Sequence, residues 1–218
     1  NIYPVNDCHE MVMDSEGRII LLTNHTKNNV IIYDQSGHLQ EVWGTRFPGA
    51  HGLTLNNENG IDYLYITDTE RHEVIKTTTD GKIIQIIEFP KESGRYNSKD
   101  QYLPTETTIA SNGDIYVADG YGLQYILHYD RYGKLINTFG GHGEEDDKFT
   151  NAHGIAIDKR KNTPTLLITD RMKNQLKSFS MDGKLLDIFD LPGAYICRPV
   201  FHKDEVYLAT IWSGEGAS

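Results

Sequence analysis

Short apolar runs that end in a polar residue recur along the chain and determine its predicted structure. Four complete copies occupy residues 20–24, 64–68, 115–119 and 166–170, and a fifth begins at Val206. A turn ending in glycine follows each complete copy, at Gly37, Gly81, Gly133 and Gly183. Because β-branched residues favour strands and glycine supplies the positive φ of hairpin turns, each copy predicts a strand within a hairpin.

Another short strand is predicted before each copy. These strands open at His9, His51, Thr105, His153 and about Pro199, between 42 and 54 residues apart. A period of this length, with four short strands in each unit, is typical of a β-propeller blade. No segment has sustained helical periodicity. The pattern therefore predicts an all-β fold, a β-propeller of four-stranded blades.

We expect a single propeller domain over residues 1–218. The predicted blades span about 9–43, 51–89, 105–139 and 153–189, with a partial fifth blade over 196–218. Each repeat needs its neighbours to cover its apolar faces. We therefore expect the natural protein to continue into a six-bladed ring, of which four and a half blades are present here. The alternative is a five-bladed ring closed by a degenerate last blade.

Charge and apolar content narrow the classes of partner. The net charge is −10, from 31 acidic and 21 basic residues, which argues against binding of nucleic acid. No apolar run approaches the 18 or so residues of a membrane span. The chain begins Asn-Ile-Tyr-Pro without a signal peptide, so we expect any such segment to have been removed and the protein to be secreted or periplasmic. Cys8 and Cys197 lie in different repeats, which leaves their pairing open.

The predicted blades bring a defined set of residues to one mouth of the channel. First strands run in one direction along the axis and second strands return to the same mouth. The residues placed there are His9, His51, Thr105 and His153 on the ring, and residues 69–71, Gly120, Tyr121 and Arg171 in the loops above it. Binding sites form where such loops converge on a rigid scaffold. The aspartates that end the second strands are expected to hold their loops through backbone N–H groups.

His51 and His153 occupy the same repeat position, and each is followed by glycine and an apolar strand. They lie two blades apart. Three inward imidazoles with an open fourth position are typical of catalytic zinc, and a third histidine is expected near position 250 of a longer chain. The alternative is that Ala-His-Gly simply starts this strand and the imidazole hydrogen-bonds inside the channel.

The same residues carry a resemblance to known families. The segment from Phe139 to Asp158 is similar to the blade junction of NHL-repeat propellers. Over residues 48–190 the chain more closely resembles the peptidyl-α-hydroxyglycine α-amidating lyases, through His51-Gly52-Leu53, Asp119-Gly120-Tyr121 and Asp170-Arg171. The Asp-Gly-Tyr and Asp-Arg pairs, each in its own blade, are more specific than the NHL pattern.

The resemblance implies a site and its cofactors. His51 and His153 would be zinc ligands, Tyr121 a general base and Arg171 an anion-binding or charge-stabilising group, with a structural calcium ion in the channel. The chain departs from the family in four ways: the third histidine is not in this chain, the family's arginine upstream of the first histidine has no clear counterpart (Arg46 is nearest), the cysteines that the animal enzymes pair around Asp-Gly-Tyr are absent, and His9 adds a histidine on the adjacent blade.

The leading hypothesis is a metal-dependent enzyme that cleaves a C–N bond in a small-molecule or peptide substrate at the channel mouth. One alternative is a non-catalytic NHL propeller that binds a peptide, glycan or protein there. Another is a calcium-dependent hydrolase of the lactonase type.

Overall fold

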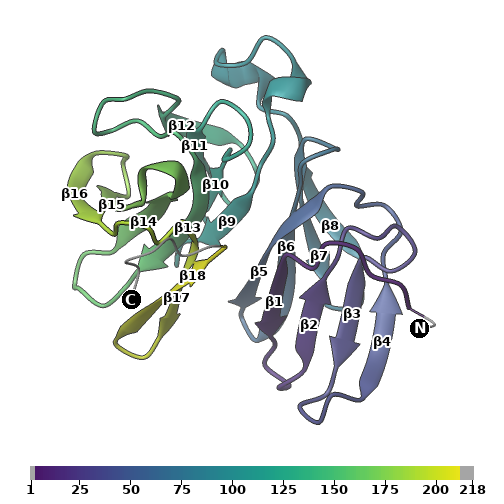
Figure 1. Ribbon diagram of the computed structural model, residues 1–218. Coiled ribbons are helices and arrows are strands. Elements are labelled where there is room, and N and C mark those ends of the chain that lie inside the picture. The colour runs from purple at the N-terminus through teal and green to yellow at the C-terminus, as the bar shows by residue number, and fades with distance from the viewer. Residues whose placement is uncertain (1–2, 212–218) are drawn as a thin grey trace.

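A computed structural model describes residues 3–211 of the chain (Figure 1). Within these residues, the strands of every sheet pair antiparallel. The first four sheets are formed, in order, by β1 (Glu10–Met13), β2 (Ile19–Leu22), β3 (Val30–Tyr33) and β4 (Leu39–Trp43); by β5 (Ala50–Glu58), β6 (Ile61–Asp68), β7 (Glu73–Thr78) and β8 (Ile83–Ile87); by β9 (Glu106–Ile109), β10 (Ile115–Ala118), β11 (Tyr125–Tyr129) and β12 (Leu135–Gly140); and by β13 (Ala152–Asp158), β14 (Thr165–Asp170), β15 (Gln175–Ser180) and β16 (Leu185–Asp190). The fifth sheet pairs β17 (Ile196–His202) with β18 (Glu205–Thr210). We call these sheets blades 1 to 5.

The blades follow one another around a common centre. The first strand of each blade contacts the first strand of the next, from β1 to β5, β9, β13 and β17, and these strands lie innermost in Figure 1. The three helical segments among residues 3–211 are single 3₁₀ turns, at Lys91–Ser93, Lys99–Gln101 and Arg171–Lys173. The predicted fold class, an all-β propeller of four-stranded blades, is confirmed. Residues 212–218 of the predicted partial blade lie outside the described residues.

Hydrophobic cores fill the spaces between consecutive blades. One cluster joins Ile20 and Leu22 of blade 1 to Leu53 and Ile66 of blade 2. Equivalent clusters lie between blades 2 and 3, blades 3 and 4, and blades 4 and 5. The stability of each blade therefore depends on its neighbours, as in other repeat proteins.

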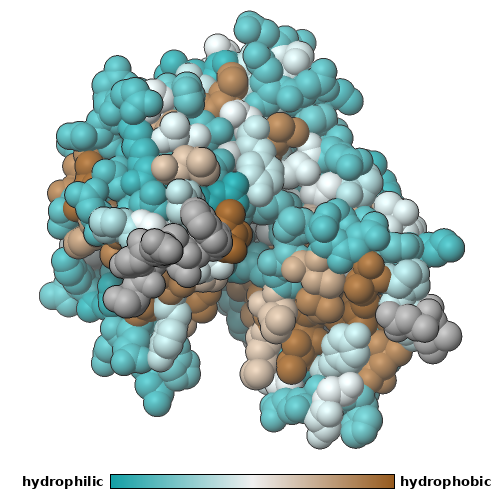
Figure 2. All heavy atoms as spheres, in the orientation of Figure 1, coloured by the Kyte–Doolittle hydropathy of each residue, from teal (hydrophilic) through white to brown (hydrophobic). Residues whose placement is uncertain are grey.

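Figure 2 shows a hydrophobic area over blade 1, where Met11 and Met13 are exposed.

A long connection separates blades 2 and 3 and accounts for the widest repeat spacing. It runs from residue 88 to 105 at the top of Figure 1 and contains two of the 3₁₀ turns. Tyr96 and Tyr102 of this segment are buried and their rings pack edge to face. The segment is thus an ordered part of the interface between these blades.

Strand β17 begins at Ile196, three residues before the predicted opening of this strand at Pro199. Cys197 lies in the bulge of β17, at the position that His51 and His153 occupy in the bulges of β5 and β13. The prediction was displaced because the Ala-His-Gly sequence of blades 2 and 4 is replaced here by Ile-Cys-Arg. Cys8 and Cys197 are both free thiols.

Candidate functional site

A continuous series of hydrogen bonds connects the channel mouths of four blades. The Nδ1 atom of His51 lies 2.9 Å from the carbonyl oxygen of Thr105 in the next blade. The Thr105 hydroxyl donates to the carbonyl of His153 at 2.7 Å, and His153 Nδ1 lies 3.0 Å from the carbonyl of Cys197. Because a carbonyl can only accept, both imidazoles carry a proton on Nδ1. Their Nε2 atoms therefore present lone pairs.

Glycines make the close approach of the blades possible. A Cβ atom on Gly52 would lie 2.4 Å from the Thr105 carbonyl oxygen, and one on Gly154 would lie 2.2 Å from that of Cys197. Any side chain at these positions would push the next blade away. The glycine after each histidine is therefore required by the blade spacing that orients the imidazole.

Both Nε2 atoms point to the hydroxyl group of Tyr121. The hydroxyl oxygen lies 3.2 Å from His51 Nε2 and 3.1 Å from His153 Nε2, and the two imidazole centroids are 5.0 Å apart. His51 is buried, whereas the Tyr121 side chain is 40% exposed at the mouth. The structure thus brings the two predicted metal ligands and the predicted base together.

One phenol proton cannot satisfy two imidazole acceptors. When both Nδ1 atoms are protonated and both rings are neutral, Tyr121 donates to only one Nε2, and the other faces an oxygen lone pair. A cation between the imidazoles removes this mismatch. Histidine ligands to zinc commonly donate their other ring nitrogen to a backbone carbonyl, as both do here. The donor chemistry therefore fits His51 and His153 as two ligands of a zinc ion.

Within residues 3–211, no group of three or more His, Cys, Asp or Glu side chains is arranged to hold a metal ion. His9, the additional histidine predicted on the ring, stacks on His51 with centroids 4.4 Å apart. Its ring lies alongside the His51 ring instead of converging on the Tyr121 hydroxyl. In the described part of the chain, the two imidazoles are thus the convergent nitrogen donors.

Burial keeps these histidines neutral. It lowers the pKa of His51 to about 4 and that of His153 to about 3, and the neighbouring imidazoles and Arg171 act in the same direction. Neutral imidazole is the form that binds metal.

We expect metal-free protein to lose stability as the pH falls from about 6.5 toward 4. In this range the unfolded chain binds protons at both histidines and the folded chain does not, so acid favours unfolding. The expected loss between pH 7 and pH 5 is about 2 kcal/mol for each imidazole. Urea unfolding after EDTA treatment measures it, and His153→Gln should show a shallower dependence. An identical pH profile in that variant would contradict the prediction.

Arg171 lies beside the tyrosine, directly after the end of β14. Its guanidinium carbon is 5.6 Å from the Tyr121 ring centroid, and Nη1 is 4.0 Å from Cys197 Sγ. The Nε atom is buried without a hydrogen-bond partner among the described residues. None of the ion pairs within residues 3–211 involves Arg171. The guanidinium therefore retains donors for an anion at the mouth.

The aspartates at the ends of the second strands hold the loops that carry these residues. Asp119 accepts the N–H groups of Leu103 and Leu123, both at 2.7 Å, and the Tyr96 hydroxyl at 2.9 Å. Tyr121 N–H in turn donates to the Leu103 carbonyl. The connection between blades 2 and 3 thus fixes the backbone of Tyr121.

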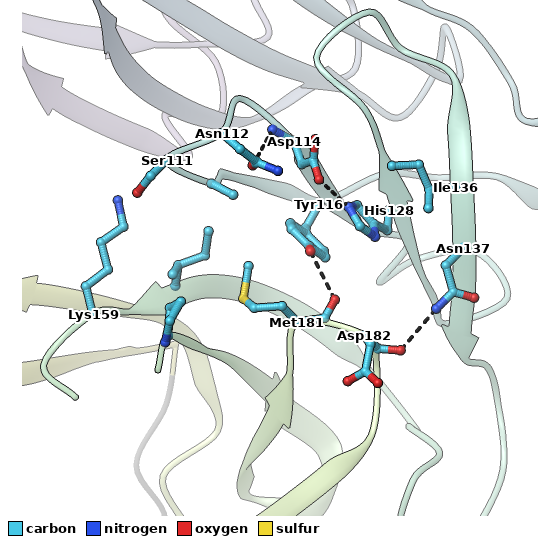
Figure 3. A pocket seen from close by; sticks show the side chains of 13 residues that line it. Ser111, Asn112, Asp114, Tyr116, His128, Ile136, Asn137, Lys159, Met181 and Asp182 are labelled. Carbon is cyan, nitrogen blue, oxygen red and sulfur yellow. Dashed lines mark hydrogen bonds and ion pairs between the residues drawn. The ribbon is translucent and has the colours of Figure 1, made fainter. Parts of the chain in front are cut away.

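A hollow lies between blades 3 and 4, at the end of the blades opposite the channel mouth that carries the histidines. It has a volume of about 540 Å³. Figure 3 shows Tyr116 donating to the Met181 carbonyl, and His128 paired with Asp114 at 2.9 Å. These bonds hold turns together and connect the two blades. They leave the hollow without convergent reactive groups of the kind found at the mouth.

Cys197 is a member of the ring that the sequence pattern did not predict. Thr105 and Cys197 stand at the repeat position of the two histidines, as the strand registers show. Counting back from the recurring second strand would have placed Cys197 beside Thr105, which was already predicted on the ring. Their contribution is the backbone carbonyl, which no side-chain motif reveals.

Comparison with known proteins agrees with this architecture. No family model matches the chain. It is 38% identical over 117 residues to peptidyl-alpha-hydroxyglycine alpha-amidating lyase 1 of Drosophila melanogaster, covering 49% of this chain and 20% of that protein. It is 30% identical over 164 residues to a probable lyase of the same name from Caenorhabditis elegans, covering 72% and 44%. Human NHL repeat-containing protein 3 is 20% identical over 181 residues, covering 79% and 51%.

Among solved structures, a streptogramin B lyase superposes with a TM-score of 0.67 at 18% identity, covering 91% of this chain and 59% of the other. At that identity the likeness shows the propeller fold alone. The chain spans between 20% and 51% of the length of these three curated relatives. No helix in the described part of the chain is long and apolar enough to cross a membrane. The chain is a β-propeller with distant homology to the peptidyl-α-hydroxyglycine α-amidating lyases and to NHL repeat proteins.

Proposed function

We propose that the chain carries part of a metal-dependent lyase site that cleaves the C–N bond of a peptidyl-α-hydroxyglycine. The observation that supports this most directly is the convergence of His51 Nε2 and His153 Nε2 on the Tyr121 hydroxyl. The related lyases carry the name of this reaction. A rigid mouth with a proton acceptor beside a candidate metal site suits abstraction of a hydroxyl proton.

In this proposal Tyr121 acts as a phenolate and removes the proton from the substrate hydroxyl. The oxygen electrons form the carbonyl of glyoxylate, the C–N bond breaks, and a proton is delivered to the departing amide nitrogen. A zinc ion held by His51 and His153 would act as a Lewis acid toward the hydroxyl oxygen. The products are a peptide amide and glyoxylate, so no oxidant or reductant is consumed.

Arg171 is proposed to bind the substrate carboxylate. Its guanidinium lies over the Tyr121 ring and has no carboxylate partner among the described residues. A carboxylate bonded there places the adjacent hydroxyl-bearing carbon close to the tyrosine. An arginine fork suits this task because it offers two parallel N–H donors.

The direct test is incubation of the full-length zinc-loaded protein with a benzoyl-α-hydroxyglycine. Release of equal amounts of benzamide and glyoxylate above the spontaneous rate supports the lyase. Binding of the compound without turnover would favour the scaffold that only binds ligands at the mouth. Hydrolysis of a lactone by the same protein, dependent on calcium, would favour the lactonase-type alternative.

Metal analysis gives a second, independent result. We expect about one zinc-like ion per full-length chain, lost in the double variant His51→Ala/His153→Ala because two nitrogen ligands are removed together. Elemental analysis by mass spectrometry measures it. His142→Ala, which changes an exposed loop histidine, should retain the ion. Equal metal content in all three proteins would place the ion elsewhere.

A further inference from the structure

One residue further along the first strands from the histidine ring, the channel contains charged side chains that take no part in the candidate site. Gly52, Glu106, Gly154 and Arg198 occupy the same repeat position in blades 2 to 5, as the strand registers show. The two glycines contribute no side chain to the channel at this level, because the main chain of the next blade lies against each of them. Glu106 and Arg198 extend into the channel, and Glu10 of blade 1 joins them.

Arg198 contacts three other blades from its position in blade 5. Its Nη1 atom pairs with Glu10 of blade 1 and lies 3.4 Å from the Leu53 carbonyl of blade 2. Its Nε atom lies 3.5 Å from Glu106 Oε2 of blade 3. The Arg198 side chain is 22% exposed, and those of Glu10 and Glu106 are 9% and 6% exposed. A largely buried cation thus joins two buried carboxyl groups.

The carboxyl oxygens of this cluster have other donors besides the guanidinium. Glu10 Oε2 accepts the Leu53 N–H at 2.6 Å. Glu106 Oε1 accepts the Thr107 N–H at 2.9 Å and the Thr54 hydroxyl at 3.1 Å. Burial raises the pKa of Glu106, and these two donors oppose the rise. Burial lowers the pKa of Arg198 to about 10, which leaves it charged at neutral pH.

A calcium ion does not fit beside this arrangement. Calcium takes six to eight oxygen ligands at about 2.3–2.6 Å, and the guanidinium already faces both carboxyl groups. A divalent ion among them would add two positive charges next to a fixed one. The channel calcium implied by the resemblance to the amidating lyases is therefore disfavoured at the level of the channel where Arg198 faces Glu10 and Glu106.

We infer that Arg198 takes the place of a divalent cation in the channel, by neutralising Glu10 and Glu106 and connecting blades 1, 3 and 5. This role is independent of the proposed lyase activity. The ion pairs of Arg198 with Glu10 and Glu106 then connect the blades just below the histidine ring, and they do so without calcium.

The test compares the melting temperature of the full chain in EGTA and in excess calcium chloride. Wild type should melt at the same temperature in both. Arg198→Gln should melt roughly 10 °C lower in EGTA, because buried carboxyl groups lose their cation. Calcium should restore most of that loss, and calorimetry should detect a calcium site absent from wild type.

Arg198→Gln/Glu106→Gln is the matched control, since it lacks one of the carboxylates and should not respond to calcium. Calcium binding by wild type that is abolished in Glu106→Gln would overturn the inference. So would an Arg198→Gln variant that melts like wild type in EGTA or that calcium fails to rescue. If Arg198→Gln does not fold, Arg198→Lys keeps the charge and should fold and ignore calcium. A calcium requirement in that variant would also overturn the inference.

Discussion

Replacing Tyr121 with phenylalanine should lower the rate of α-hydroxyglycine cleavage about 10²–10⁴-fold, the usual contribution of a positioned acid–base group. The variant keeps the aromatic ring and removes the hydroxyl that contacts both Nε2 atoms. Because the side chain is 40% exposed, we expect the melting temperature to change little. Zinc content should also stay the same, since both histidines remain. Steady-state kinetics on a benzoyl-α-hydroxyglycine would measure the effect on kcat.

Tyr132→Phe provides the matched control. This tyrosine is 82% exposed in the turn between β11 and β12, and its substitution should leave turnover unchanged. Near wild-type turnover in Tyr121→Phe would remove the tyrosine from the proposed chemistry. Loss of zinc together with activity would instead show that the hydroxyl supports metal binding.

The largest stability effect is expected at Lys177. Its side chain and that of Asp170 are fully buried, with Nζ 3.2 Å from Asp170 Oδ2. The ammonium also donates to the Lys148 carbonyl at 2.5 Å and lies 5.0 Å from the Phe149 ring centroid. Lys177→Met leaves the carboxylate buried without its cation and should cost about 3–5 kcal/mol of the free energy of unfolding. Urea denaturation measures this loss.

Two variants test the cause of that loss. Lys184→Met, on an exposed turn, should change the free energy of unfolding by less than about 0.5 kcal/mol. Asp170→Asn/Lys177→Met removes both charges and should recover much of the stability lost in the single variant, because no buried charge is left unpaired. A double variant as unstable as the single one would assign the loss to packing.

Much of the fold follows from local patterns. The apolar runs predicted the second strands because a short continuous run of apolar and β-branched residues is a local signal for a buried strand. Strands β6, β10 and β14 end at or one residue before the predicted aspartates. The mouth position of Tyr121 also follows, since a residue just after a second strand lies at the same end of the sheet as the start of the first.

The contacts within the site could not be predicted in this way. Whether Tyr121 reaches both imidazoles depends on the angle between blades, which is set by packing across several interfaces. The cluster of Glu10, Glu106 and Arg198 joins side chains far apart in the sequence, and no repeat motif marks them. Long-range ion pairs leave no periodic signal, so they appear only once the blades are assembled.

The bonds from His51 to the Thr105 carbonyl and from His153 to that of Cys197 connect equivalent positions of successive blades. Because each acceptor is a main-chain oxygen, the side chain at that position can change without disturbing the imidazole before it. Histidine, threonine and cysteine all stand there in this one chain. When a blade is duplicated, the new copy therefore brings both a position for a ligand side chain and a main-chain oxygen that can orient the imidazole of the blade before it. A lineage of such proteins can therefore gain, lose or exchange ligands around one channel by single substitutions, with the scaffold unchanged.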